Sequence, residues 1–313
     1  MSERAATPVP VDADGAGEER ASVCGGPSGP LAIVAGRGAL PRALAEARAK
    51  AGMPYLLVVF AECFEPWMAD HPHQHHRFEK AGRLFAALAE AGAEGIVFAG
   101  AMNRPRLRPW AADWTALSIL PRALALLARG DDAMLRGFAA LFEDRGLRLY
   151  GAQEVLGGSL ALPAGVIGKH SPSARARADA VAAAAIVTAL APHEVGQGAV
   201  VANGLCLAVE AVEGTDLMLA RLADLPPARR RRAPPPSGVL VKIPKPAQDL
   251  RLDTPTIGPQ TVRAAAAAGL SGIVGLAGAT QVLDRAETAA LADAKGLFVW
   301  GATAADLGLE AAA

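Results

Sequence analysis

The sequence predicts an α/β protein of two domains, the first of which is built on a parallel sheet. In the first half, short apolar runs alternate with stretches of helical periodicity, which is the pattern of a Rossmann-like domain. In the second half, two apolar runs flank Asn203-Gly204, a dipeptide that favours a tight hairpin. A chain of 313 residues, 52% of them hydrophobic, has enough apolar surface for two cores.

The first domain is expected over residues 30–160, after a disordered extension at 1–29 that is rich in Gly, Pro, Ala and acidic residues. Strands and helices alternate within it, which predicts a parallel sheet. The expected elements are strands at 31–35, 55–60, 95–100 and 147–150 and helices at 41–51, 82–91, 117–129 and 132–145.

The second domain is expected over residues 163–304, followed by a tail at 305–313. Ser171-Pro172 predicts the start of a helix that ends near Ala191, because serine caps free amides and proline fits the first turn. After it we expect a hairpin at 198–202 and 205–209, a helix at 217–223 capped by Thr215 or Asp216, a strand region at 242–258 and further α/β units to Gly301.

Charge and cysteine content argue against several classes of protein. The chain has 31 basic and 31 acidic residues, so its net charge of +0 gives no electrostatic case for a nucleic-acid partner. Its cysteines are widely spaced and form no CxxC pair, so a disulfide framework or zinc knuckle is not predicted and a reducing cytoplasm is expected. No apolar run is long enough to span a bilayer, so a lipid substrate would be met from the water side.

The segment from Lys242 to Gly258 concentrates groups that handle phosphate. Asp249, Arg251 and Asp253 alternate with leucines, so a strand would bury the leucines and present the charges together. A helix would also place both aspartates on one side. Two such carboxylates suit a divalent cation, and nearby basic side chains suit phosphate oxygens. The alternative is a charged edge strand whose ions pair with one another.

A glycine-rich turn, Gly36-Arg37-Gly38, follows the first predicted strand and opens a helix, which is where backbone amides receive a phosphate. Pro41 occupies the third position of the dinucleotide fingerprint, and no acidic residue clearly ends the second strand. The turn therefore favours a single nucleotide or a pyrophosphate over nicotinamide or flavin. Asn103 and Arg104 follow the third strand, where ligands of such sheets lie; the alternative is a polar turn.

For three other polar clusters, a structural interpretation stands beside a functional one. Of Asp131 and Asp132, one is expected to cap a helix, which leaves the other as a candidate ligand contact. The histidines between His71 and His76 could bind a transition metal, but a solvated loop is favoured. The run Arg229 to Arg232 is expected to be a solvated loop, with contact to anionic lipid head groups as the alternative.

Several motifs occur in an order that resembles the LpxI family of UDP-2,3-diacylglucosamine pyrophosphatases. The likeness runs from about Leu31 to Gly301, and several motifs in one order are more specific than any one alone. The motifs are the stretches 35–41, 120–121, 130–136, 193–198, 209–216 and 242–258.

The resemblance implies hydrolysis of the pyrophosphate of UDP-2,3-diacylglucosamine to UMP and 2,3-diacylglucosamine 1-phosphate (lipid X), a step of lipid A biosynthesis. It implies dependence on Mg²⁺, with water attacking the phosphorus next to the sugar. It also implies a Rossmann-like N-terminal domain, a C-terminal α/β domain of unusual fold and a ligand cleft between them. A cytoplasmic enzyme is expected, with contact to the inner face of the inner membrane and a homodimer left open.

The resemblance ties activity most closely to Asp253, as a magnesium ligand or a water-orienting base. Lys242, Lys245 and Arg251 are assigned to the phosphates, and Asp216, Glu210 and Asp249 are assigned as further metal ligands. The acyl chains are expected against apolar walls between the domains. The candidate substrate contacts are Gly36, Gly38, Ala39, Gly100, Asn103, Arg104, Asp131, Asp132, Gln197, Gly214, Thr215, Gln248 and Thr256.

Two rival functions remain at this stage. An NAD(P)-dependent oxidoreductase is permitted by the first strand, turn and helix, although Pro41 and the missing ribose-binding acid argue against it. A non-catalytic carrier of a UDP-sugar or lipid would use two domains around a cleft equally well.

Overall fold

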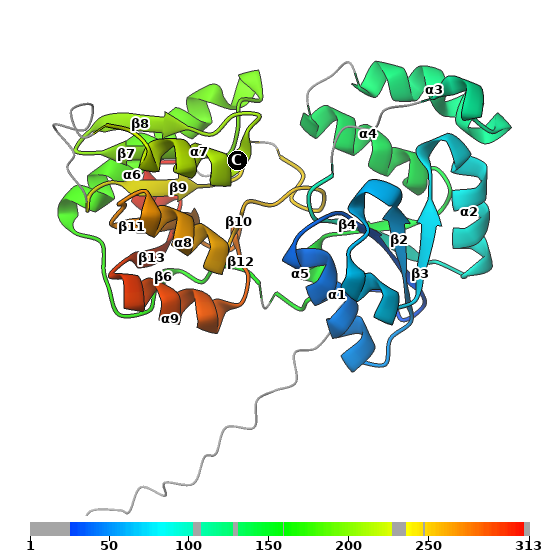
Figure 1. Cartoon of the computed structure of the whole chain (residues 1–313), viewed down its shortest axis with the longest axis horizontal. Helices are drawn as coiled ribbons and strands as arrows, with labels where there is room; N and C mark the ends of the chain where they lie inside the picture. Colours follow the sequence, from blue (N-terminus) through cyan, green and yellow to red (C-terminus); the bar gives the residue numbers. More distant parts are fainter. Residues whose placement is uncertain are drawn as a thin grey trace, which may run out of the picture.

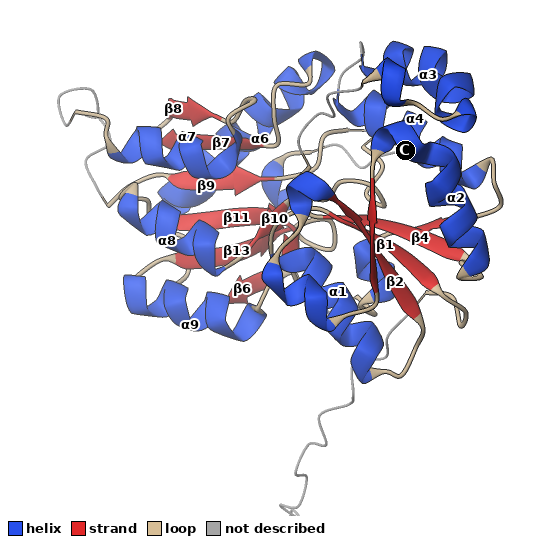
Figure 2. Ribbon diagram, turned by 45° about the vertical axis from the view of Figure 1, so that its right-hand side comes forward, coloured by secondary structure: helices blue, strands red, loops and turns tan. Residues whose placement is uncertain are grey.

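The computed structural model describes residues 26–102, 108–127, 131–158, 160–226, 236–246 and 248–309. They form two α/β lobes that lie side by side (Figure 1). We call residues 26–158 the N-terminal lobe and residues 160–309 the C-terminal lobe. Each lobe has its own sheet with helices on both faces, as Figure 2 shows, which confirms the predicted α/β class.

The N-terminal lobe contains a sheet of five strands in the order β3-β2-β1-β4-β5, and every neighbouring pair is parallel. This confirms the predicted parallel sheet. The strand order reverses between β1 and β4, so the switch point where such sheets bind ligands lies at their carboxyl ends. The strands are β1 (Leu31–Ala35), β2 (Tyr55–Phe60), β3 (His73–His76), β4 (Gly95–Ala99) and β5 (Arg148–Tyr150).

The histidine segment was predicted as a solvated loop, and this prediction is wrong. Residues His73–His76 form the edge strand β3, which pairs with β2 in parallel register. An edge strand needs a partner on one side only, so polar side chains are tolerated there because they reach water. His76 is buried, and burial lowers its pKa. Within the described ranges, no group of three or more His, Cys, Asp or Glu side chains could hold a metal ion.

Helices cover both faces of the N-terminal sheet. On one face, α1 (Ala39–Lys50) and α5 (Ala152–Val155) pack over the strands. On the other face, α2 (Ala81–Glu90) and α4 (Asp131–Glu143) pack on the sheet, and α3 (Trp114–Leu127) packs on α2 and α4. The second face therefore has an additional helix outside its first layer.

The start of the N-terminal lobe is more ordered than the sequence predicted. Residues 26–29 belong to the expected disordered extension, but the guanidinium of the buried Arg48 donates hydrogen bonds to the carbonyls of Pro27 and Gly29, both at 2.9 Å. A buried charge of this kind must be hydrogen-bonded, and the carbonyls of this segment provide its partners.

The C-terminal lobe contains a mixed sheet of six strands in the order β6-β13-β11-β9-β7-β8. The three central strands β13, β11 and β9 are parallel, and the outer ones are antiparallel to their neighbours. The predicted hairpin is confirmed, with Asn203 and Gly204 both at positive φ in its turn. The strands are β6 (Gly165–Ile167), β7 (Gly198–Ala202), β8 (Leu205–Val209), β9 (Val239–Lys242), β11 (Gly272–Leu276) and β13 (Phe298–Ala302).

One face of this sheet is covered by α6 (Ala174–Leu190) and the other by α7 (Gly214–Ala223), α8 (Pro259–Ala267) and α9 (Arg285–Lys295). Successive strand residues serve opposite faces, as the strand period of two requires. The last helical turn, η7 (Ala305–Leu307), buries Leu307 against α6. The expected tail is therefore packed into the lobe as far as that residue.

Two predicted helix caps are corrected by the structure. The cap of α6 is Ser173, whose hydroxyl accepts from the Ala176 amide at 3.1 Å, and not Ser171. The N-cap of α7 is Glu213, which makes no side-chain cap bond, so Thr215 and Asp216 lie inside the first turn. The hydroxyl of Thr215 instead bonds two other side chains, described below.

The strand predicted over Asp249 to Asp253 is also wrong. The amides of Leu252 and Asp253 both donate to the carbonyl of Asp249, at 3.0 and 3.3 Å, so this stretch makes a single turn. Pro244 and Pro246, just after β9, lack the amide hydrogens that would continue a ladder. The chain returns to extended form at β10 (Thr256–Ile257), which pairs with β12 (Gln281–Val282).

This turn is one of the places where the two lobes touch. Leu252 is 8% exposed and packs within an apolar cluster of the N-terminal lobe. A second contact is made by Leu283, which packs against the cluster beneath α1. In Figure 1 the segment after β9 crosses from the C-terminal lobe to its neighbour. The residue after Leu252 is Asp253, so the lobe contact and the predicted catalytic residue are adjacent.

Candidate functional site

The candidate site lies at the edge of the C-terminal sheet where β9 ends. Strand pairing places Gly198 of β7 opposite Lys242 of β9, and Val209 of β8 opposite Ala199. Gln197 precedes β7 and Glu210 follows β8, so both lie at this edge together with Lys242. Antiparallel pairing therefore brings together polar residues that are distant in sequence.

Asp253 is held at this edge by two glutamine side chains. The amide of Gln248 donates to Oδ2 of Asp253 at 2.8 Å, and the amide of Gln197 donates to the same oxygen. Gln248 also donates to the main-chain carbonyl of Asp253 at 3.1 Å and accepts from the Lys245 amide at 2.9 Å. Both amide donors favour the ionised carboxylate and fix its orientation.

Burial raises the pKa of Asp253 above its ordinary value. The hydrogen bond from Gln197 and the positive charges of Lys242 and Lys245 oppose this shift, and the negative charge of Glu210 adds to it. A carboxylate with a raised pKa is a better proton acceptor than an ordinary aspartate.

Lys242 belongs to a chain of hydrogen bonds that ends at a buried carboxylate. Its ammonium donates to the hydroxyl of Thr215 at 2.8 Å, and that hydroxyl donates to Oε1 of Glu210 at 2.8 Å. Glu210 is only 9% exposed, and its Oε2 accepts no hydrogen bond within the described part of the chain. A Cβ at Gly198 would lie 2.6 Å from that oxygen, so glycine there leaves the carboxylate its space.

These groups can act on a phosphate and its counter-ion. The ammonium of Lys242 suits a phosphate oxygen, and the carboxylates of Asp253 and Glu210 suit a divalent cation. Buried polar atoms without partners are uncommon in native proteins, so Oε2 of Glu210, which has none in the described part of the chain, is an acceptor open to a ligand. Mg²⁺ usually takes one or two protein carboxylates together with substrate phosphates, and the residues present fit that requirement.

Asp249 and Arg251 are committed to each other instead. The guanidinium of Arg251 donates to both carboxylate oxygens of Asp249, at 3.0 and 2.7 Å, and lies 3.7 Å from Glu143 of α4. The hydrogen bond from Arg251 lowers the pKa of Asp249. For this half of the segment, the structure gives the self-paired ions that the sequence allowed as an alternative.

The other residues predicted in the C-terminal lobe differ in exposure and in what they contact. Asp216 is exposed in the first turn of α7, and Gly214 begins that helix at positive φ. The hydroxyl of Thr256 donates to the carbonyl of Thr254 at 2.9 Å. Lys245 is half-buried, and its charge acts on Asp253.

In the N-terminal lobe, the loops after β1 and β4 are joined by their backbones. Arg37 and Ala101 exchange two main-chain hydrogen bonds of 2.9 Å. A Cβ at Gly36 would lie 2.7 Å from the carbonyl oxygen of Ala101, so this close approach requires glycine. Gly100, at positive φ, completes the same junction. These predicted residues therefore have a structural role here that does not depend on a ligand.

The amino end of α1 meets a carboxylate within the protein. The amide of Gly38 donates to Glu65 at 3.4 Å, and Ala39 begins the helix. Asn103, Arg104 and the run Arg229 to Arg232 lie outside the described residues. The side chains of Asp131 and Asp132, at the start of α4, are likewise outside the description.

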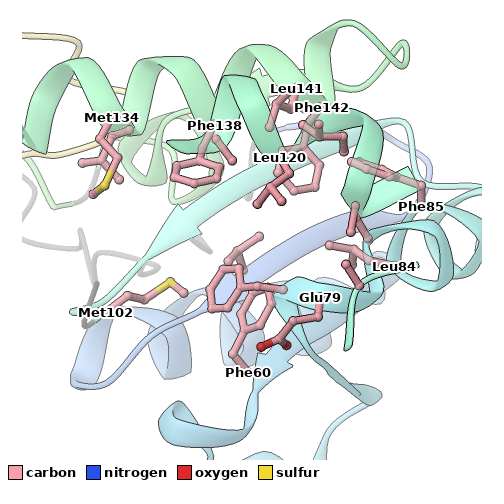
Figure 3. A pocket seen from close by; sticks show the side chains of 18 of the residues that line it. Phe60, Glu79, Leu84, Phe85, Met102, Leu120, Met134, Phe138, Leu141 and Phe142 are labelled. Carbon is pink, nitrogen blue, oxygen red and sulfur yellow. The ribbon is translucent and has the colours of Figure 1, made fainter. Parts of the chain in front are cut away.

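Sequence reasoning missed an apolar cavity of ≈ 180 Å³ in the N-terminal lobe (Figure 3). It is lined by residues of α2, α3, α4 and the adjacent sheet. The signal available in the sequence was the apolar composition of α3. This helix has more apolar residues than its buried face needs, since Leu117 and Leu124 remain exposed in the fold.

Comparison with known proteins covers both lobes. The model of the LpxI N-terminal domain matches residues 30–159, and the model of the LpxI C-terminal domain matches residues 163–300. A curated relative, the UDP-2,3-diacylglucosamine pyrophosphatase LpxI of Caulobacter vibrioides, is 43% identical over 271 residues. The aligned region covers 87% of this chain and 96% of the relative.

Proposed function

The chain belongs to the LpxI family of hydrolases, and from this premise we propose that it cleaves the pyrophosphate of UDP-2,3-diacylglucosamine in lipid A biosynthesis. The observation that carries the proposal is the similarity to the Caulobacter enzyme over both lobes. The cluster of Asp253, Lys242 and Glu210 supports it, because pyrophosphate cleavage needs positioned charge more than covalent chemistry.

The proposed reaction is attack by water on the phosphorus next to the glucosamine. A bond forms between the water oxygen and that phosphorus, and the bond from phosphorus to the bridging oxygen breaks. UMP leaves with the bridging oxygen, and 2,3-diacylglucosamine 1-phosphate is the other product. Asp253 accepts the proton of the water, while Lys242 contacts the phosphate oxygens on which charge develops.

The hydrogen-bonded neighbours of these two residues hold them in place. Gln197 and Gln248 fix the Asp253 carboxylate, so that it faces the water without rotating. Thr215 fixes the Lys242 ammonium and connects it to Glu210. Such preorganisation matters because donors that need not rearrange during the reaction stabilise the transition state more.

We propose Mg²⁺ as the cation, held by Asp253 and Glu210 together with the substrate phosphates. When bound, the ion neutralises phosphate oxygens and makes the phosphorus more open to attack. Glu210 suits this role because its Oε2 is a buried acceptor without a partner in the described part of the chain.

For the uridine nucleotide we propose the carboxyl edge of the N-terminal sheet. The candidate contacts there follow β1 and β4, and Arg251 lies beside Gly151, which follows β5. A ligand at this edge would therefore lie close to the segment that carries Asp253. The candidates are Gly36, Gly38, Ala39, Gly100, Asn103 and Arg104.

A cytoplasmic enzyme that meets its lipid at the inner-membrane surface is the localisation we propose. No helix in the described ranges has the length and apolar character needed to cross a membrane. Trp110 and Trp114 are 84% and 88% exposed, and tryptophan is a side chain that favours the boundary between lipid and water. A homodimer stays a prediction.

The proposal is tested by incubating the purified protein with UDP-2,3-diacylglucosamine in Mg²⁺ or in EDTA and separating UMP from UDP. We expect UMP from the magnesium-loaded wild type and none above background in EDTA. Asp253→Ala should lose about 10³-fold or more in rate, within the range for a lost general base. Intact substrate recovered from a protein that binds it would support the carrier instead.

A further inference from the structure

Two glutamine side chains hold the same oxygen of Asp253, but the structure uses them differently. Gln197 and Gln248 each donate an amide hydrogen to Oδ2 of Asp253. Of the two ends of a glutamine amide, only Nε2 can donate to a carboxylate, so these bonds fix which end of each amide faces Asp253. Each amide oxygen is therefore turned away from Oδ2 and meets other surroundings.

The amide oxygen of Gln248 is occupied. It accepts from the main-chain amide of Lys245 at 2.9 Å, and Nε2 of the same side chain also donates to the main-chain carbonyl of Asp253 at 3.1 Å. The polar atoms of Gln248 are therefore used within the segment from Lys245 to Asp253. Its role is to hold this segment in shape, and with it the Asp253 carboxylate.

The amide oxygen of Gln197 is buried and has no hydrogen-bond partner among the residues that the structure describes. Leaving a buried acceptor unpaired costs about 1–3 kcal/mol, so native proteins usually provide a partner, which can be an ordered water. Oε1 and Nε2 of Gln197 are bonded to one carbon, and Nε2 contacts the Asp253 carboxylate. A water bound to this oxygen is therefore within reach of Asp253.

We propose that Gln197 is a further catalytic residue whose Oε1 accepts a hydrogen bond from the attacking water, an inference that rests on the function proposed above. The water donates one hydrogen to Gln197 and the other to Oδ1 of Asp253, since both glutamine amides use Oδ2. With both hydrogens fixed, the lone pairs of the water oxygen face the phosphorus. As the bond to phosphorus forms, the proton on the Asp253 side passes to that carboxylate.

The two glutamines provide a matched pair of variants, Gln197→Leu and Gln248→Leu. Each variant loses an amide donor to Oδ2 of Asp253, but only Gln197→Leu also loses the oxygen assigned to water. Gln197→Leu should therefore lower kcat about five-fold further than Gln248→Leu, which corresponds to one hydrogen bond. The KM of Gln197→Leu should change little, because the partner that is lost is water and not the substrate.

Stability should show the opposite order. In urea unfolding, Gln248→Leu should have the lower midpoint, because the side chain of Gln248 makes three of the described hydrogen bonds and that of Gln197 makes one. If Gln197 only positioned Asp253, the variant that loses more hydrogen bonds would also be the slower one. Rates that follow the order of stability would therefore overturn the water site.

Methanol as a competing nucleophile gives a readout that a structural role would not change. Its oxygen attacks the same phosphorus, UMP leaves with the bridging oxygen, and the proton of its single O–H passes to Asp253. The product is the methyl ester of 2,3-diacylglucosamine 1-phosphate. Because methanol has no second O–H for Gln197, Gln197→Leu should raise the ratio of this ester to 2,3-diacylglucosamine 1-phosphate about five-fold. Gln248→Leu should keep the wild-type ratio, since it affects both nucleophiles through Asp253.

A second substitution at the same position does not depend on how well Gln197→Leu folds. Gln197→Glu keeps an oxygen that can accept from water but replaces the amide donor with a second negative charge beside Asp253. Its kcat should fall, yet its ratio of methyl ester to hydrolysis product should stay at the wild-type value. A ratio that rises in Gln197→Glu as well would show that the oxygen is not what selects water.

The outcomes separate this role from the proposed function. Turnover by the wild type together with an unchanged ratio in Gln197→Leu would refute the water site and leave the hydrolase standing. A higher Mg²⁺ concentration for half-maximal rate in Gln197→Leu, but not in Gln248→Leu, would assign the oxygen to the cation and overturn the proposal. Absence of UMP from the wild type would refute the hydrolase, and the role of Gln197 with it.

Discussion

Asp249 and Asp253 lie in the same segment, but the fold gives their carboxylates opposite surroundings. Asp249 is paired in bidentate fashion with Arg251, which lowers its pKa. Asp253 is taken from water and held by two amides, and burial raises its pKa. The comparison shows that one residue type in one segment can be an ion-paired carboxylate of lowered pKa or a buried carboxylate of raised pKa, depending on what packs around it.

The largest expected effect is on turnover and separates the two aspartates directly. Asp253→Asn should lower the rate of UMP formation by about 10³-fold or more, since an amide can neither accept the proton nor bind the cation. Asp249→Asn should change it by no more than a few-fold, because its carboxylate faces Arg251 and not the site. Equal losses in the two variants would show that the pair is functionally one unit.

The second effect concerns the lysine that the site positions. Thr215→Val removes the hydroxyl between Lys242 and Glu210 and leaves both groups without that partner. Loss of a hydrogen bond to a charged group corresponds to about 1.5–3 kcal/mol, so kcat should fall by about ten-fold or more. Thr215→Ser keeps the hydroxyl and should restore most of the activity. If the serine variant is as slow as the valine variant, the hydrogen bond is not the cause.

The third effect concerns Leu252, which lies between Asp249 and Asp253 in sequence and packs against the N-terminal lobe. Leu252→Ala should destabilise the protein by about 2 kcal/mol or more in urea unfolding, because it empties a buried apolar position. It should also lower kcat, since the anchor of Asp253 is lost. Leu250→Ala is the matched control, because Leu250 is only half-buried, and its effect should be smaller on both measures.

The smallest effect is on stability and has opposite signs for the two aspartates. A raised folded-state pKa means that the ionised Asp253 destabilises the fold above that pKa, and the cost disappears as pH falls below the unfolded value near 3.8. Asp253→Asn should therefore raise Tm at pH 7–8 and lose this gain in acid. Asp249 has a lowered pKa and stabilises the fold above its unfolded value, so Asp249→Asn should lower Tm at neutral pH. Thermal melts of both variants from pH 3 to pH 8 check the two signs.

Parts of the fold were predictable because they depend on neighbours in sequence. The apolar run at Leu31–Ala35 and the turn at Asn203-Gly204 specify their structures through local burial pattern and backbone preference. The strand His73–His76 was missed because its stability comes from the free edge of β2 and not from its own residues. The turn at Asp249 was missed because alternation alone does not tell a strand from a charged loop.

The sequence by itself determined the α/β class, the alternation in the N-terminal lobe, the family resemblance and the segment that carries Asp253. Only the tertiary structure decided which of its carboxylates is buried, because Gln197, which holds Asp253, is 56 residues away. It also decided that Leu252 joins the lobes and that an apolar cavity lies beneath α3. Burial, pKa and cavities depend on contacts between distant segments, whereas helices, strands and turns follow largely from local interactions.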